Sequence, residues 1–359
     1  MNDTEATRPF DDRALGDWLR GRLGADEVHV RLHGRPAGGF SAETLLLDAD
    51  VTVGGATDAR RFVLRKETPE PPVYPQQSDL VMPEIEIQYR IMDALGTRTS
   101  VPVATMIGYD AGDDVCGAPF FVMSHVDGVV PIESPPYTTE GFFTDATPTQ
   151  RTALVSSGLA SLAALHDVDR STLDLDWLLP AGVRPGSRRL VDLWREFGRA
   201  ELDGRSHPLL ERAWDLVDAT LPPDGRLVLC WGDPRPGNII WRDFAPACLT
   251  DFEAACVGPP EFDLAWWLMF DRTMHEGAGV ERLPGDPDRD EQRRLYFEFA
   301  GRPVVDTSAH ELFAAARYAV IVVRVMNRLE QRGLLPADST VWLENPASEC
   351  LASILSEVD

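Results

Sequence analysis

Apolar positions near the start of the chain predict one short helix followed by a β-rich segment. Between residues 13 and 23 they recur at helical spacing, with Leu15, Trp18 and Leu19 on one side, and the pattern stops at Gly24. Runs of alternating or β-branched residues then predict strands at 28–32, 44–53, 62–65, 103–108 and 119–124, with a helix at 83–95. The first third of the chain is therefore expected to form a small antiparallel sheet.

Beyond residue 128 the pattern changes from mainly strands to mainly helices. A first helix is marked by Leu154, Leu159, Leu162 and Leu165, further helices are predicted at 187–203, 206–220, 261–276, 286–300, 308–332 and 340–357, and short strands at 226–231, 239–241 and 248–250. The sequence predicts an α+β fold of two lobes. The β-rich N-terminal lobe covers 1–125, with a hinge at about 124–126, and the mainly helical C-terminal lobe covers 126–359.

Composition narrows the class of protein. The net charge of −24, from 58 acidic and 34 basic residues, argues against nucleic-acid binding, which needs dense Lys and Arg. Five cysteines without a C-x-x-C pair indicate reduced thiols. No apolar stretch reaches the roughly 20 residues that span a bilayer, and the N-terminal residues lack a signal-peptide pattern. We expect a soluble, cytoplasmic protein that binds neither nucleic acid nor membrane; the oligomeric state is not predicted.

The most specific chemical signal is W-G-D-P-R-P-G-N at 231–238, followed by T-D-F-E at 250–253. A predicted strand ends in a loop that carries Asp233 and, five positions later, Asn238, while Asp251 follows another strand. The catalytic loop of kinases has the same Asp-to-Asn spacing: its Asp receives the hydroxyl proton, and the Asn and a second Asp hold magnesium. Oxygen ligands of this kind suit Mg²⁺.

Each of these residues is also explained by turn chemistry, because Asp-Pro, Pro-Gly and Gly-Asn are common turn sequences. The two spacings together, between predicted strands, favour a kinase-type site. The motifs H-E-x-x-H, G-x-S-x-G, Walker A and G-x-G-x-x-G are not found in the sequence, which argues against zinc protease, hydrolase and dinucleotide-binding sites.

With these motifs the chain resembles the aminoglycoside phosphotransferase family, kinase-like enzymes that phosphorylate small molecules. The family pattern consists of H-G-D, N with two apolar residues, D-[WF]-E, G-x-P and D-L-A. The corresponding segments of this chain are, in the same order, Trp231-Gly232-Asp233, Asn238-Ile239-Ile240, Asp251-Phe252-Glu253, Gly258-Pro259 and Asp263-Leu264-Ala265. Only Trp231 departs from it. The resemblance implies a protein-kinase-like fold and transfer of the γ-phosphoryl group of ATP, with Mg²⁺, to a hydroxyl of a small molecule.

The resemblance also implies roles for individual residues. Asp233 is expected to act as the base, and Asn238 and Asp251 as the metal ligands. Arg235 is expected to assist the transferred phosphate. Asp263 is expected to anchor the catalytic loop rather than to react, and a histidine at the end of the predicted helix, His166, is expected to be structural.

A glycine-rich segment, G-G-F-S, lies between two predicted strands, as a loop that covers nucleotide phosphates does. Gly38 and Gly39 allow close approach of the backbone, and Ser41 follows in the same loop. A plain turn explains the glycine pair equally well when it is taken alone. The downstream motifs make it a candidate nucleotide-binding loop.

A cation for the α- and β-phosphates is expected on the strand that carries V-L-R-K at 63–66. Side chains alternate along a strand, so Arg65 and Val63 share a face whereas Lys66 points the other way. Arg65 is therefore assigned, with Lys66 as the alternative. The partner of this cation is usually a helical Glu, and Gln88 stands in its place.

The run F-F-V-M-S-H-V at 120–126 resembles the hinge that joins the lobes in this family; taken alone, it also fits a plain core strand. The resemblance implies that adenine bonds there to backbone groups of Ser124, His125 and Val126. Glu84, one helical turn before Gln88 on the same face, is an alternative partner for the Arg65 cation. Otherwise Glu84 is expected to be a surface charge.

The acceptor is left open among antibiotics, choline-like molecules and hydroxyacyl metabolites, and so is the choice between ATP and GTP. The departures Trp231, Ala42 and Gln88 also allow a nucleotide-binding pseudokinase with a regulatory role. A protein kinase is disfavoured, because no peptide-docking segment separates Asp251 from Asp263.

Overall fold

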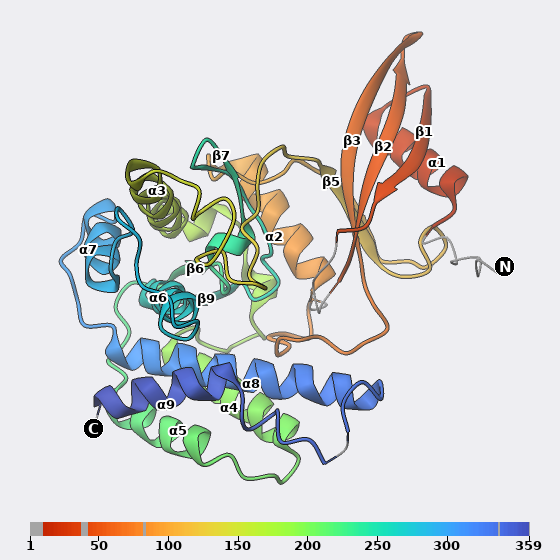
Figure 1. Ribbon diagram of the computed structural model, residues 1–359. Coiled ribbons are helices and arrows are strands. Elements are labelled where there is room, and N and C mark those ends of the chain that lie inside the picture. Colours follow the sequence, from red (N-terminus) through yellow and green to blue (C-terminus); the bar gives the residue numbers. More distant parts are fainter. Residues whose placement is uncertain (1–9, 37–41, 82–83, 337, 359) are drawn as a thin grey trace, which may run out of the picture.

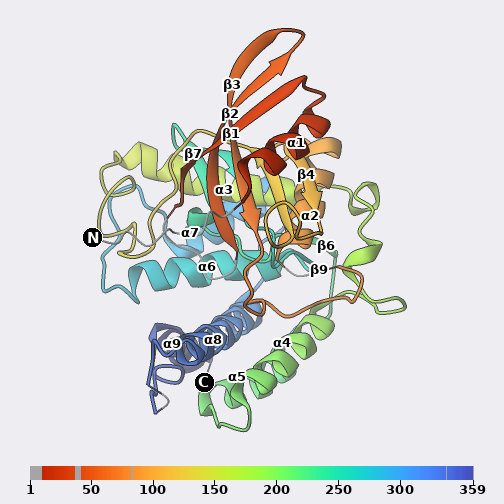
Figure 2. The ribbon, with the colours of Figure 1, turned by 90° about the vertical axis from the view of Figure 1, so that its right-hand side faces the viewer.

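The computed structural model describes residues 10–36, 42–81, 84–336 and 338–358. A five-stranded sheet stands at one end of the molecule and a group of helices at the other, with α6 and short strands between them (Figures 1 and 2). This arrangement confirms the predicted α+β fold with a β-rich N-terminal and a helical C-terminal region.

The N-terminal sheet has the strand order β1-β2-β3-β5-β4, and every neighbouring pair is antiparallel. Its strands and the two helices packed on it are β1 (Glu27–Gly34), β2 (Glu43–Val53), β3 (Ala56–Lys66), β4 (Met106–Asp110), β5 (Phe120–Ser124), α1 (Asp12–Leu23) and α2 (Ile85–Arg98). Alternation along the strands divides the side chains between two cores: Phe62 and Leu64 face α1, whereas Val63 and Phe121 face α2.

The β2–β3 hairpin is longer than the sequence predicted. Its turn is Gly54-Gly55, with φ of 58° and 83°, the left-handed conformation that a two-residue hairpin turn favours. The first half of β3 is exposed on both faces, because the hairpin projects beyond the core (Figure 1). A projecting strand needs no apolar residues, so hydrophobic pattern alone predicted only its buried half.

The C-terminal region is built around α8, a 24-residue helix that packs against α4, α5, α6 and α9. Its helices are α3 (Pro148–Asp167), α4 (Ser187–Leu202), α5 (Pro208–Thr220), α6 (Glu261–His275), α7 (Arg289–Phe299), α8 (Ser308–Gln331) and α9 (Pro346–Val358). The region also contains two short antiparallel strand pairs. They are β6 (Val228–Cys230) with β9 (Cys256–Gly258), and β7 (Ile239–Arg242) with β8 (Ala245–Leu249). The three-residue β9 was not predicted.

A single apolar core joins α2 and one face of the sheet to the helical region. The other face of the sheet forms a second core with α1. Helix α2 shares this large core with the helices of the C-terminal region. As a result, β3 packs close to the loops of the C-terminal region, and we call this place the junction of the two regions. The candidate site lies at this junction.

Candidate active site

The loop from Trp231 to Asn238 connects β6 with β7 and is fixed at its start by Asp263. The Asp263 carboxylate, on the first turn of α6, accepts the N–H groups of Trp231 at 2.6 Å and Gly232 at 2.9 Å and also bonds to His166 at 2.9 Å. Gly232 has a φ of 89°, and a Cβ there would lie 2.0 Å from the Ala254 carbonyl oxygen, so only glycine fits. These bonds agree with the anchoring role expected of Asp263.

Asp233 is 3% exposed and receives hydrogen bonds from four side chains. Oδ1 accepts from Trp266 Nε1 at 2.6 Å. Oδ2 accepts from Asn238 Nδ2 at 2.8 Å, Arg235 Nε at 3.1 Å and the Tyr74 hydroxyl at 3.2 Å. Burial raises the pKa of Asp233, and the positive charge of Arg235 opposes that shift. The carboxylate is thus held in one orientation and its charge is partly balanced.

Arg235 connects Asp233 to Glu133, which comes from the loop between β5 and α3. Its Nη1 contacts Glu133 Oε2, and its guanidinium lies 4.9 Å from the centroid of the Phe270 ring. Burial lowers the pKa of Arg235, but Asp233 and Glu133 outweigh it and raise the value above normal. Arg235 therefore stays charged beside the base. Glu133 was not predicted from the sequence, because its loop carries no motif.

Asn238 and Asp251 are brought together by Thr250, whose N–H and hydroxyl donate to the Asn238 carbonyl at 3.0 and 2.9 Å. Asn238 turns its Nδ2 toward Asp233, which leaves its amide oxygen as a ligand atom. Asp251 has a φ of 63°, a conformation that Asp tolerates better than most residues. One carboxylate and one amide oxygen, completed by nucleotide phosphates, form a donor set that suits Mg²⁺.

Arg65 of β3 reaches across the junction of the two regions. Its Nη1 lies 3.1 Å from Asp251 Oδ1 and 3.1 Å from Gln88 Oε1 on α2. Lys66, on the opposite face of the strand, pairs with Glu43 at 3.2 Å. The alternation of side chains therefore distinguishes the two cations, and Arg65 is the one beside the predicted metal ligands.

Glu84 contradicts the expectation of a surface charge, since it is 3% exposed. One carboxylate oxygen accepts the Val73 N–H at 3.1 Å and lies 3.7 Å from Arg328 Nη2 of α8. Burial raises the pKa of Glu84, and Arg328 partly opposes this shift. The expectation was wrong because Glu84 is buried by contacts outside its own helix, with Val73 eleven positions away and with Arg328 of α8. Gln88 is fully buried and bonded to Arg65, as its position suggested.

The predicted hinge begins at Ser124, the last residue of β5. The N–H of Ser124 donates to the Thr105 carbonyl at 2.8 Å, and that of His125 to the Arg61 carbonyl at 3.1 Å. Val126, next along the chain, is half-buried against the large core. Gly38, Gly39 and Ser41 of the predicted phosphate loop lie outside the described residues.

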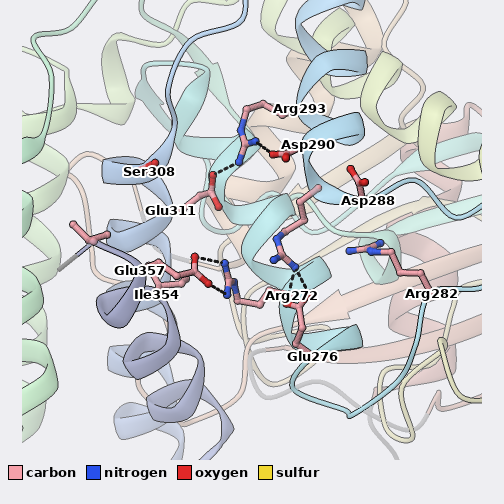
Figure 3. A pocket seen from close by; sticks show the side chains of 12 residues that line it. Arg272, Glu276, Arg282, Asp288, Asp290, Arg293, Ser308, Glu311, Ile354 and Glu357 are labelled. Atoms are coloured by element: carbon pink, nitrogen blue, oxygen red, sulfur yellow. Dashed lines mark hydrogen bonds and ion pairs between the residues drawn. The ribbon is translucent and has the colours of Figure 1, made fainter.

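One pocket of about 400 Å³ lies away from these residues, between α6, α7, α8 and α9 (Figure 3). Its lining is charged, and its arginines are paired: Arg272 with Glu357 at 2.7 Å, and Arg293 with Glu311 at 2.9 Å. None of the site residues predicted from the sequence is among those that line it. We therefore place the candidate site at the junction of the two regions.

Comparison with known proteins gives one consistent fold. The model of the phosphotransferase enzyme family matches residues 34–297. A solved structure from Ralstonia eutropha, described as a candidate aminoglycoside phosphotransferase, superposes with a TM-score of 0.68 at 23% identity, over 96% of this chain and 95% of that one. An ethanolamine kinase from Plasmodium vivax superposes with a TM-score of 0.56 at 12% identity, over 91% and 82%. At these identities the solved structures establish the fold alone.

Among curated proteins, mouse acyl-CoA dehydrogenase family member 10 is 28% identical over 283 residues, which is 75% of this chain and 24% of the relative. The chain thus spans about a quarter of the length of that protein. In the part of the chain that the structure describes, no helix has the length and apolar content needed to cross a bilayer.

Proposed function

The chain belongs to the phosphotransferase enzyme family, and from this premise we propose that it transfers the γ-phosphoryl group of ATP to a hydroxyl of a small molecule. The observation that carries the proposal is the meeting of Asp233, Asn238, Asp251 and Arg65. Asn238 bonds to Asp233 at 2.8 Å, and Arg65 bonds to Asp251 at 3.1 Å. The two pairs are joined through Thr250, which precedes Asp251 and donates its N–H to the Asn238 carbonyl at 3.0 Å. Phosphoryl transfer needs this set: a base, oxygen ligands for a metal, and a cation for phosphate.

Asp233 is the base in this proposal. It receives the acceptor's proton while the hydroxyl oxygen attacks the γ-phosphorus. Trp266 and Asn238 hold the carboxylate from opposite sides, so its position is fixed before the acceptor binds. Arg235 keeps a positive charge next to the base and next to the phosphoryl group in transit.

Asn238 and Asp251 would hold Mg²⁺, which when bound neutralises charge on the nucleotide phosphates. The carboxylate of Asp251 pairs with Arg65 at 3.1 Å. We propose that Arg65 then also binds phosphate oxygens, for which its planar guanidinium is suited. Gln88 orients Arg65 without neutralising it, because it is an amide rather than a carboxylate.

For the nucleotide base, we propose the hinge at 124–126, between an N-terminal lobe at 1–125 and a C-terminal lobe at 126–359. The N–H groups of Ser124 and His125 already donate to other carbonyls. We therefore assign the Val126 N–H as the donor to adenine, and Gly38, Gly39 and Ser41 as the loop over the phosphates.

The acceptor is proposed as a small hydroxylated molecule that binds on the side of Asp233 facing Arg235 and Glu133. Relatives with this fold are named for aminoglycosides and ethanolamine, and curated relatives for acyl-CoA. A screen should therefore include all three chemical classes. It would follow ADP release from ATP and Mg²⁺ with each acceptor, and then identify the phosphorylated product by mass spectrometry.

The proposal expects acceptor-dependent ADP release and a product heavier by one phosphate. Tight ATP binding with no turnover across the panel would instead favour a regulatory pseudokinase. Phosphorylation of a generic peptide would indicate a protein kinase.

A further inference from the structure

A proline-rich segment between β3 and α2, residues 67–78, crosses from the sheet to the helical region, and we call it the strap. Figure 1 shows it in orange, leaving the lower end of β3 toward α8 before the chain returns to α2. Arg324 of α8 donates from Nε to the Pro72 carbonyl at 3.0 Å. Gln77 donates from Nε2 to the Ala255 carbonyl at 2.6 Å. The strap is thus fixed on both sides of Tyr74.

Tyr74 is the residue that the strap brings to the candidate site. It is 8% exposed, and its ring packs edge-on against Trp194, with 6.2 Å between centroids. Its hydroxyl donates to Asp233 Oδ2 at 3.2 Å. Burial raises the pKa of Tyr74 well above normal, and the negative charge of Asp233 adds to the shift. The phenol therefore stays protonated and remains a donor.

The Tyr74 hydroxyl differs from the other three donors to Asp233. Trp266, Asn238 and Arg235 donate N–H groups at 2.6 to 3.1 Å, whereas Tyr74 donates an O–H at the longest distance. The Tyr74 hydroxyl is neutral and donates an O–H to the carboxylate. The hydroxyl of an acceptor alcohol would make the same kind of hydrogen bond to Asp233. Oδ2 already receives three donors, so another hydroxyl reaches it only by replacing one of them.

We propose that Tyr74 is a specificity-determining residue whose hydroxyl occupies the acceptor's position on Asp233 and keeps water from it. The inference rests on the proposed role of Asp233 as base. A bound acceptor displaces the Tyr74 hydroxyl with its own, since the binding energy of the rest of the acceptor favours the exchange. A water molecule has no such additional contacts. The strap therefore selects the acceptor against water.

The reaction that this contact suppresses is hydrolysis of ATP. In it, a water oxygen forms a bond to the γ-phosphorus, and the bond from that phosphorus to the bridging oxygen breaks, with its electron pair leaving on ADP. One proton of the water passes to Asp233, and the other stays on the inorganic phosphate that is released. Removing the Tyr74 oxygen would leave a space of about one water molecule beside Oδ2, at the place where this attack begins.

The test measures ADP release from ATP and Mg²⁺ in the absence of any acceptor. Tyr74→Phe should raise this rate about fivefold, as expected for the loss of one hydrogen bond to the base, while the KM for ATP stays unchanged. Gln77→Ala keeps the tyrosine but loosens the strap, and should raise the rate by a smaller factor. Tyr109→Phe, on β4 and away from Asp233, should leave the rate unchanged.

A hydrolysis rate that is unchanged or lower in Tyr74→Phe would overturn the inference, because a merely structural role predicts a loss. If Tyr74→Phe does not fold, Gln77→Ala carries the test alone, and no increase in its rate overturns the inference. A failure of the proposed function looks different. In that case Asp233→Asn would keep acceptor-dependent turnover, whatever Tyr74→Phe does.

Discussion

The indole Nε1 of Trp231 lies 2.7 Å from the carbonyl oxygen of Thr250 and donates a hydrogen bond to it. The Trp231 ring also stacks on Phe252, with 5.4 Å between centroids. These contacts join the start of the loop that carries Asp233 to the chain on both sides of Asp251. At this position, where the family pattern has histidine, this chain has the larger side chain of tryptophan.

Replacing Trp231 tests whether this connection serves the site. Trp231→Phe keeps an aromatic ring but removes the N–H, so the half-buried Thr250 carbonyl loses its donor. We expect a loss of about 1–2 kcal/mol in unfolding free energy and a fall of about tenfold in kcat as the two segments separate. Urea unfolding and the ADP-release assay measure the two effects.

Trp231→His is the matched variant, because it restores the family pattern and a ring N–H. It should recover part of the kcat that Trp231→Phe loses. Equal activity in all three proteins would contradict the positioning role of this bond.

The two cations at the end of β3 can be separated by mutation. Arg65→Met removes the guanidinium that bonds Asp251 and Gln88, and should raise the KM for ATP about tenfold or more, as expected for a charge-assisted contact with phosphate. Lys66→Met removes the cation that pairs with Glu43 on the other face, and should change this KM less than twofold. Steady-state kinetics with varied ATP gives both KM values. A larger rise in KM for Lys66→Met than for Arg65→Met would reassign the phosphate contact to Lys66.

Glu67, at the start of the strap, makes stability depend on pH. Burial, with repulsion from Glu84 and Glu86, raises its pKa from 4.5 to about 7. A carboxyl whose pKa is raised on folding stabilises the protein fully below pH 4.5, and this contribution is lost as the pH rises through 7. Wild type should therefore be less stable than Glu67→Gln at pH 8, and similar to it at pH 4.5.

The expected difference at pH 8 is about 1 kcal/mol, because solvent screening at this half-buried position reduces the full effect of the shift. Urea unfolding at the two pH values measures it. Glu140→Gln, at an exposed position, serves as the control and should show no such dependence. An equal effect of Glu67→Gln at pH 4.5 and pH 8 would reject a raised pKa for Glu67.

Some of the site could be predicted because its residues are close in sequence. Asp233 and Asn238 lie in one loop, and the spacing of Asp251 follows from the short β7–β8 hairpin between them. Arg65 could be distinguished from Lys66 by the alternation of side chains along a strand, a local property of the chain. Local geometry of this kind is encoded over a few residues, so the pattern alone was sufficient.

Other partners of Asp233 could not be predicted, because they come from distant segments. Tyr74 lies 159 positions from Asp233 in the chain, and the Glu133 that pairs with Arg235 lies 102 positions from it. Trp266 of α6 is buried, and its Nε1 donates to Asp233. Whether a buried polar atom contacts the site depends on tertiary packing, which hydrophobic pattern does not record.

The account as a whole depends on Asp233 as the base. The most direct measurement is ADP release by Asp233→Asn with the acceptor that the screen identifies, beside a titration of ATP binding and the control Asp243→Asn in the exposed β7–β8 turn. We predict that Asp233→Asn lowers kcat about a thousandfold, within the range for general bases, while ATP binding and the control remain as in wild type. Turnover by Asp233→Asn at the wild-type rate would contradict the account.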